Sequence, residues 1–199
     1  MDYRQLGGSG LKVSALLGHH DVRRRHRPRH RVAHRRPREG AGGVNFIDTA
    51  DGYNAGRSEE AIGRAIGNNR AWWVLATKCA SPIGKEPNAR GLSRRHMFHA
   101  VEASLKRLST DVIDLLYPHK EDQATLLAET VHALAYLIRA GKIRYFGVSN
   151  YRAWRVAEIC RLCDQAGINR PVASQPHYNT LNREVEIEHL PAAATSGSA

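Results

Sequence analysis

The residues of this chain that could do acid–base chemistry follow short apolar runs. An aspartate, a lysine and a histidine stand at the end of such runs or just beyond them, and a serine–asparagine pair and a glutamine follow two more. Side chains of these types carry charge and transfer protons in enzyme sites. Taken singly, each is also typical of a turn, a strand end, a core position or a helix N-cap, so only their joint placement indicates a site. The residues are Asp48, Lys78, His119, Ser149, Asn150 and Gln175, with Tyr53 in the loop after Asp48.

The apolar runs predict the elements that would bring these side chains together. Short apolar or β-branched runs alternate with amphipathic stretches at intervals of roughly 25 to 40 residues, which is typical of a βα repeat. In a parallel sheet the carboxyl ends of the strands meet at one edge, where a barrel places its site. We therefore expect strands at residues 44–47, 73–77, 112–117, 143–148 and 172–174.

Helix signals stand between these runs. Ser58, with Glu59 and Glu60 in the first turn, is the expected N-cap of one helix, and Ser93 is that of a second. A third helix should end just before Gly141, which takes the C′ position. Its apolar stripe consists of Leu127, Val131, Leu134 and Ile138. At the start of the chain, YRQLG and LKVSAL are separated by glycines, which predicts a short β-hairpin.

Residues 19–40 carry most of the positive charge. They hold nine arginines against Asp21 and Glu39, which accounts for +7 of the formal net charge of +11. The segment has no apolar periodicity and cannot bury enough surface to offset its ordering entropy, so we expect it to be irregular. A polybasic segment attracts phosphates, but this one is accompanied neither by a motif that recognises bases nor by aromatic side chains on which bases could stack. We expect no specific nucleic-acid partner.

Composition also bears on location and on metals. The chain has no apolar run of about 18 residues, and its N-terminus lacks the pattern of a secretory signal. We therefore expect a cytoplasmic protein with no membrane partner. Cys79, Cys160 and Cys163 are an odd number, which fits reduced thiols. The CxxC of Cys160 and Cys163 falls in an apolar helical pattern, so we expect buried small side chains and no metal site.

Several motifs in succession resemble the aldo-keto reductase family. The stretch GVNFIDTADGYNAGRSEEAIG, which contains Asp48 and Tyr53, is similar to the family signature. VLATK, DLLYPH, GKIRYFGVSN and SQPHYN follow in the family's order. Within the family, the chain resembles the bacterial branch related to potassium-channel beta subunits. The resemblance extends over residues 1–16 and about 42–191.

The resemblance implies four catalytic residues. Tyr53 would donate a proton to the substrate oxygen. A tyrosine has an ordinary pKa of about 10, and the neighbouring ammonium of Lys78 would lower that pKa. Asp48 would hold the ammonium charged and oriented, and His119 would hydrogen-bond the substrate oxygen.

The resemblance also implies the cofactor NADPH (NADP). Ser149, Asn150 and Gln175 would hold the nicotinamide carboxamide, and Asp48 belongs to the same cofactor-binding set. The preference for NADP over NAD comes from the resemblance alone. The implied reaction is reduction of the carbonyl of small aldehydes or ketones, so the expected partner is a small-molecule carbonyl substrate.

The implied fold is α/β, a (β/α)8 TIM barrel with the hairpin at its bottom. A complete barrel has eight βα units in about 250 residues. This chain offers about six, and an aberrant segment at about 17–41 stands where the end of the first strand and the first helix are expected. We therefore expect residues 1–199 to form one incomplete barrel domain.

Two other functions stay open at this point. A catalytically inactive truncated fragment or pseudoenzyme would keep the site residues without a competent cofactor cleft, because the loops after strands seven and eight cover the cofactor's pyrophosphate in the family. A polybasic nucleic-acid-binding protein would use the arginine tract instead. Cofactor titration separates the first alternative from an active reductase, and salt-dependent nucleic-acid binding tests the second.

Overall fold

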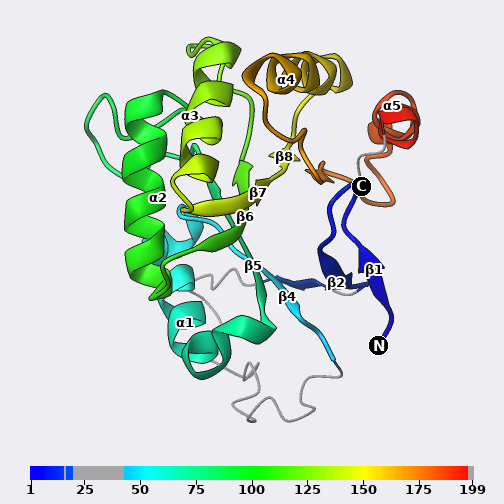
Figure 1. Cartoon of the computed structure of the whole chain (residues 1–199). Coiled ribbons are helices and arrows are strands. Elements are labelled where there is room, and N and C mark those ends of the chain that lie inside the picture. Colours follow the sequence, from blue (N-terminus) through cyan, green and yellow to red (C-terminus); the bar gives the residue numbers. More distant parts are fainter. Residues whose placement is uncertain (16, 20–42, 197–199) are drawn as a thin grey trace.

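A curved parallel sheet with helices on its outer side forms the centre of the computed structural model, which describes residues 1–15, 17–19 and 43–196 (Figure 1). Five strands lie in the order of the chain and pair in parallel. They are β3 (Leu17–His19), β4 (Phe46–Asp48), β5 (Val74–Cys79), β6 (Ile113–Pro118) and β7 (Ile143–Phe146). A short parallel pair, β8 (Val148–Ser149) and β9 (Ser174–Gln175), continues the series.

The strands expected from the apolar runs all form, with bounds shifted by one or two residues. The run at 143–148 is divided at Gly147 into β7 and β8. The division follows from pairing, because β7 pairs with β6 whereas β8 pairs with β9. The expectation of an α/β fold built on a parallel sheet is confirmed.

The structure corrects the expectation for the segment at about 17–41. Leu17–His19 form β3, which pairs in parallel with β4 and places Leu17 opposite Phe46. Three residues are too few to show an apolar period, and the backbone pairing to β4 makes them a strand. The rest of the segment expected to be irregular, residues 20–40, lies outside the described residues.

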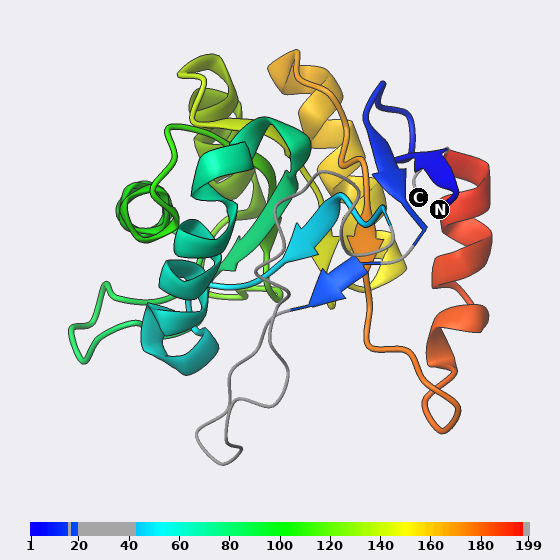
Figure 2. The same cartoon turned by 90° about the horizontal axis from the view of Figure 1, so that it is seen from below.

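The expected hairpin at the start of the chain is confirmed. β1 (Tyr3–Gln5) and β2 (Lys12–Ser14) pair antiparallel. The side chain of Asn45 ties the hairpin to the sheet, because its Oδ1 accepts from the Ser14 N–H at 2.7 Å and its Nδ2 donates to the Lys12 carbonyl at 3.1 Å. The hairpin lies beside α5 (His189–Ser196) in both views (Figures 1 and 2).

Helices cover the outer side of the sheet (Figure 1). The N-cap expected at Ser93 is confirmed, since its side chain accepts from the His96 N–H at 3.3 Å. The N-cap expected at Ser58 is wrong. The first helix begins earlier, after Gly56, whose left-handed backbone (φ 85°) ends a preceding 3-10 turn. Gly141 has φ 69° just beyond the third helix, as expected. The helices are α1 (Arg57–Ile66), α2 (Arg94–Leu108), α3 (Leu127–Arg139) and α4 (Ala153–Ala166), with 3-10 helices at Tyr53–Gly56, Gly67–Trp72 and Glu184–Glu186.

Two apolar clusters pack against the two faces of the sheet. Successive strand side chains point to opposite faces, so alternate residues enter different clusters. In β5, Leu75 packs with the helices, whereas Val74 and Ala76 pack with Leu6 and Val13 of the hairpin. This alternation decides which strand residues face the helices and which face the inside of the curved sheet.

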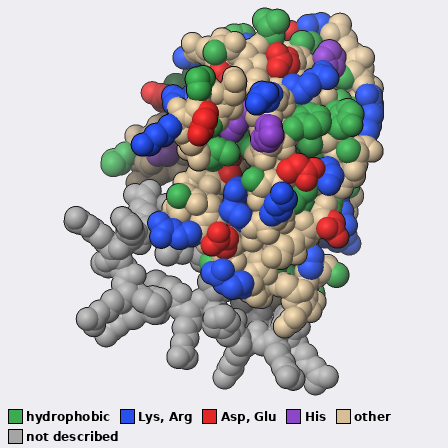
Figure 3. Space-filling view, turned by 90° about the vertical axis from the view of Figure 1, so that its left-hand side faces the viewer, with side chains coloured by type: hydrophobic (Ala, Val, Ile, Leu, Met, Phe, Trp, Pro, Cys, Tyr) green, Lys and Arg blue, Asp and Glu red, His purple; other side chains and the backbone are tan. Residues whose placement is uncertain are grey.

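The outer face of the molecule carries interspersed charges of both signs (Figure 3). Within the described ranges, no helix is long and apolar enough to cross a membrane. Cys160 and Cys163 are buried free thiols in α4, as expected. Burial raises the pKa of the Cys163 thiol to about 12, which keeps it protonated and unreactive near neutral pH.

Close packing of α1 on α2 gives a first prediction. A Cβ added at Gly63 would lie 2.7 Å from the carbonyl oxygen of Arg107 and from backbone atoms of Leu108, and backbone cannot move aside easily. We expect Gly63→Ala to lower the free energy of unfolding by about 1–3 kcal/mol in urea denaturation followed by circular dichroism. Gly67→Ala is the matched control, since nothing lies within 4 Å of its added Cβ. An unchanged stability in Gly63→Ala would contradict this packing.

Candidate functional site

The polar residues expected to form a site stand at the carboxyl ends of successive parallel strands. Asp48 is the last residue of β4 and Lys78 the penultimate residue of β5. His119 directly follows β6, and its N–H donates to the Cys79 carbonyl at 2.8 Å. The remaining members end β8 and β9 or follow them: Ser149, Asn150 and Gln175. Their expected placement at the carboxyl ends of the strands is confirmed, with the last three at the separate pair β8 and β9.

A buried ion pair lies at the centre of this group. The Lys78 ammonium donates to Oδ2 of Asp48, and the side chains of both residues are 1% exposed. The ammonium also donates to the Thr49 carbonyl at 2.9 Å. Alternation in β4 and β5 explains the pairing, because both residues lie on the inner face with Phe46 and Ala76. Sequence analysis did not find the Thr49 carbonyl, because every residue has one and its use depends on backbone direction.

Tyr53 lies beside the ion pair. Its hydroxyl is 3.5 Å from Lys78 Nζ, at the outer limit of a hydrogen bond. The same nitrogen lies 5.1 Å from the centre of the phenol ring, within the range of a cation–π contact. The His119 ring meets the Tyr53 ring edge-on, with the ring centres 5.7 Å apart. The structure therefore brings together all four residues expected to be catalytic.

Backbone hydrogen bonds place Tyr53 there. After β4 the loop runs along the end of β5, where the Thr49 N–H donates to the Ala76 carbonyl at 3.1 Å and the Asp51 N–H donates to the Lys78 carbonyl at 3.0 Å. The Tyr53 N–H then closes a turn onto the Ala50 carbonyl at 3.1 Å. The loop that carries the phenol is thus fastened to the strand that carries the lysine.

The second group of expected residues lies at the end of β8 and β9. Ser149 Oγ donates to the Gln175 carbonyl at 3.0 Å. Asn150 has a left-handed backbone (φ 55°), and its side-chain amide donates to Ser149 Oγ at 3.0 Å and to the His119 carbonyl at 3.2 Å. These bonds join the second group to the first. The side-chain amide of Gln175 makes no hydrogen bond to another described residue, so it can serve a ligand.

Burial and charge act in opposite directions on Lys78. Loss of hydration lowers the pKa of its ammonium from the usual value, and the charge and hydrogen bond of Asp48 raise it in part. The lysine thus depends on Asp48 for its positive charge. Removing the carboxylate would leave a buried ammonium with no opposite charge, and with only the Thr49 carbonyl and the more distant Tyr53 hydroxyl among the partners described above.

Asp51 is a buried acid that sequence analysis did not single out. Its side chain is 1% exposed, and neither carboxylate oxygen has a hydrogen-bond partner of good geometry among the described residues. Burial, and secondly the negative charge of Glu59, raise the pKa of Asp51 to about 7. An aspartate in a loop after a strand gives no sequence signal for this, because its burial depends on how α1 packs.

The described part of the chain holds no cluster of three or more histidine, cysteine, aspartate or glutamate side chains that could bind a metal ion.

Comparison with known proteins places this geometry in context. Residues 41–197, well over half of the chain, match the profile of the Aldo/keto reductase family. A probable voltage-gated potassium channel subunit beta of Arabidopsis thaliana is 38% identical over 218 residues, which cover 99% of this chain and 61% of the relative. The versiconal hemiacetal acetate reductase of Aspergillus parasiticus is 33% identical over 227 residues, which cover 99% of this chain and 65% of that relative. Norsolorinic acid reductase B of Aspergillus parasiticus is 39% identical over 163 residues, which cover 78% of this chain and 43% of that relative. The chain thus spans less than two thirds of the length of these relatives.

Asp51 generates a prediction about pH and stability. The native acid keeps its proton up to about pH 7, whereas an unfolded aspartate loses it near pH 3.8, so the native state binds more protons between these values. Asp51 therefore makes stability fall as pH rises through this window, by at most about 4 kcal/mol. We expect Asp51→Asn to be more stable than the wild type at pH 8 and closer to it at pH 4, measured by urea denaturation.

The control for this experiment is Asp111→Asn, because Asp111 is exposed. That variant should follow the wild-type dependence on pH. If Asp51→Asn kept the full wild-type slope between pH 4 and pH 7, Asp51 would be ionised in the native state and the argument from burial would be wrong.

Proposed function

Because the chain belongs to the aldo/keto reductase family, we propose that it is an NADPH-dependent oxidoreductase that reduces the carbonyl of small aldehydes or ketones to alcohols. The observation that carries the proposal is the buried Lys78–Asp48 ion pair with the Tyr53 hydroxyl 3.5 Å from the ammonium. A phenol held beside an ammonium is an acid able to protonate an alkoxide near neutral pH.

Each of the four residues has a separate task in the proposed reaction. Tyr53 donates its hydroxyl proton to the carbonyl oxygen as that oxygen gains negative charge. Lys78 stabilises the phenolate that remains, and the phenolate regains a proton from water before the next turnover. Asp48 keeps the ammonium charged. His119, edge-on to the Tyr53 ring, hydrogen-bonds and orients the carbonyl oxygen.

The residues of β8 and β9 fit the carboxamide of a nicotinamide ring. A carboxamide offers one acceptor and two donors, and Gln175 has a side-chain amide that is not used by other described residues. Asn150 lies at the exposed rim, where its bonds to Ser149 and to the His119 carbonyl fix its orientation. When bound, NADPH supplies the hydride, and the role of these three residues is to fix which face of the ring is presented.

We propose the (β/α)8 barrel as the architecture of the complete family fold to which these strands belong. The parallel order β3 to β7, continued by β8 and β9, supports this proposal, as does the covering of the outer side by α1 to α4. On this proposal residues 1–199 are one partial barrel domain, which works in the cytoplasm on a small carbonyl substrate without a nucleic-acid or membrane partner.

The alternative is a catalytically silent chain with the same site residues. It concerns the chain as it stands, which spans 61% of the Arabidopsis relative and 65% of the versiconal hemiacetal acetate reductase. The two functions differ in cofactor binding. We expect saturable, micromolar NADPH binding in a fluorescence titration of the purified chain, with an intact family member as the positive control. A folded sample that binds no NADPH would establish the silent alternative.

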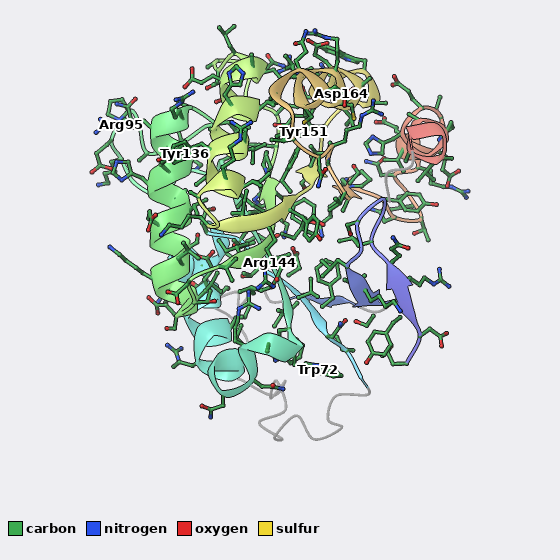
Figure 4. All side chains as sticks on the ribbon, viewed as in Figure 1. Trp72, Arg95, Tyr136, Arg144, Tyr151 and Asp164 are labelled. Carbon is green, nitrogen blue, oxygen red and sulfur yellow. The ribbon has the colours of Figure 1, made fainter. Side chains whose placement is uncertain are left out.

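Replacing the proton donor tests the site itself. We expect Tyr53→Phe to lower kcat for aldehyde reduction by about 100-fold or more, because general acid catalysis is lost, and to leave NADPH affinity within about twofold. The measurement is the decrease in NADPH absorbance with an aromatic aldehyde. Tyr136→Phe is the matched control, since that tyrosine is 56% exposed on α3 (Figure 4). Equal turnover by Tyr53→Phe and wild type would assign the proton transfer to another group.

A further inference from the structure

A buried carboxylate behind the site joins three elements. Glu59, in the first turn of α1, is fully buried. Its Oε2 accepts from Arg107 Nε of α2 at 2.6 Å, and its Oε1 accepts from Thr77 Oγ1 of β5 at 2.6 Å. We refer to Glu59, Arg107 and Thr77 as the carboxylate bridge. Both oxygens of Glu59 are used, so the bridge fixes the relative position of α1, α2 and β5.

The bridge reaches β5 at the residue before Lys78. Successive strand residues point to opposite faces, so Thr77 faces the helices while Lys78 faces the site. A shift of Thr77 therefore moves Lys78 as well. The charge of Glu59 also acts on two neighbouring titratable groups, because it adds to the effect of burial in raising the pKa of Asp51 and of Cys79.

At its other end the bridge supports the turn that follows Tyr53. Asn54 (φ 50°), Ala55 (φ 55°) and Gly56 (φ 85°) all have left-handed backbone. This conformation is unfavourable for residues other than glycine, and such a turn persists only where its surroundings hold it. The turn directly adjoins the phenol, so a change in its backbone would move the Tyr53 hydroxyl.

The side chain of Arg107 forms the surface on which this turn rests. A Cβ added at Gly56 would lie 2.7 Å from Arg107 Cδ and 2.9 Å from its Nε. The turn can approach the Arg107 side chain this closely only because position 56 has no Cβ and because the arginine is held in place. Two bonds hold it, one to Glu59 at 2.6 Å and one from its Nη2 to Ser104 Oγ at 3.2 Å.

We propose that Arg107 is a positioning residue, which acts through Glu59, Thr77 and the turn at Gly56 to hold the Tyr53 hydroxyl at the Lys78 ammonium. The kinetic part of this inference rests on the proposed reductase function. The structural part concerns only the distance between the phenol and the ammonium, and it can be measured without turnover.

The experiment compares three variants of the whole chain. Arg107→Gln removes the bridge at α2, and Thr77→Val removes only the hydroxyl at β5 while keeping the shape of the side chain. Arg95→Gln is the matched control, since Arg95 lies exposed on the same helix and points away from the sheet (Figure 4). Circular dichroism establishes which variants are folded, and Thr77→Val decides the question if Arg107→Gln does not fold.

The first readout is the ionisation of Tyr53, followed by NMR of tyrosine labelled with carbon-13 at Cζ and assigned through Tyr53→Phe. Because the ammonium favours the phenolate, we expect the titration midpoint of Tyr53 to rise in Arg107→Gln by on the order of one pH unit. Thr77→Val should shift it in the same direction by less, and Arg95→Gln should not shift it.

The second readout is the pH profile of aldehyde reduction. We expect kcat of Arg107→Gln to fall by about 10-fold to 100-fold, because small misplacements of reacting groups slow a reaction by such factors. The pH midpoint of kcat that reports the acid Tyr53 should shift as it does in the NMR titration. KM should stay within about twofold, because the bridge does not touch the substrate.

The two readouts separate the two proposals. A wild type that reduces no aldehyde contradicts the reductase function, while a shifted Tyr53 midpoint in the variants still supports positioning by Arg107. Identical Tyr53 midpoints in wild type and all folded variants overturn the positioning inference, even if the wild type is an active reductase.

Discussion

The rest of the site depends on a lysine that is buried with its charge. An ammonium loses several kcal/mol of hydration free energy on burial, and only a close carboxylate with further hydrogen bonds compensates for that loss. Asp48 and the Thr49 carbonyl provide this compensation from the end of β4, which lies beside β5 in the sheet. The requirement fixes the register of the two strands, because a slip by one residue would turn Lys78 or Asp48 toward the apolar helix layer. The buried charge is thus a constraint on the sheet as well as a chemical group.

Two further acids, Glu59 and Asp51, are buried behind the site, and they differ in the partners that their carboxylates have. Glu59 is paired with Arg107 and accepts from Thr77, so both of its carboxylate oxygens have a partner. Neither carboxylate oxygen of Asp51 has a hydrogen-bond partner of good geometry among the described residues. Burial and, secondly, the neighbouring negative charge of Glu59 both disfavour ionisation of Asp51 and raise its pKa to about 7. Asp51 lies in the loop that carries Tyr53, and Glu59 lies in the first turn of α1, shortly after that loop. Electrostatics behind the site and geometry within it are therefore connected.

Much of this arrangement could be predicted from the residues alone. The apolar runs predict the strands, and a polar residue at the end of each run predicts which edge of the sheet carries the site. The prediction was less successful where local signals competed. Ser58 has the residue type of an N-cap, but the left-handed Gly56 starts α1 earlier and leaves Ser58 inside the helix. Residues Leu17–His19 are a strand because β4 lies beside them, and three residues are too few to show a period. The family resemblance from the motifs is confirmed by the match over residues 41–197.

The sequence by itself determined the order of the elements and the kinds of group at the site, because periodicity and residue type are local properties. Only the tertiary structure decided which of those groups meet. Lys78 and Tyr53 are 25 residues apart, and their 3.5 Å approach depends on the loop fastened to β5 by backbone bonds that any residue type could make. The burial of Asp51 and Glu59, and the approach of Arg107 to Gly56, likewise follow from how α1 and α2 pack on the sheet. Charge state and distance in a protein interior depend on what surrounds a group, and those surroundings come from distant parts of the chain.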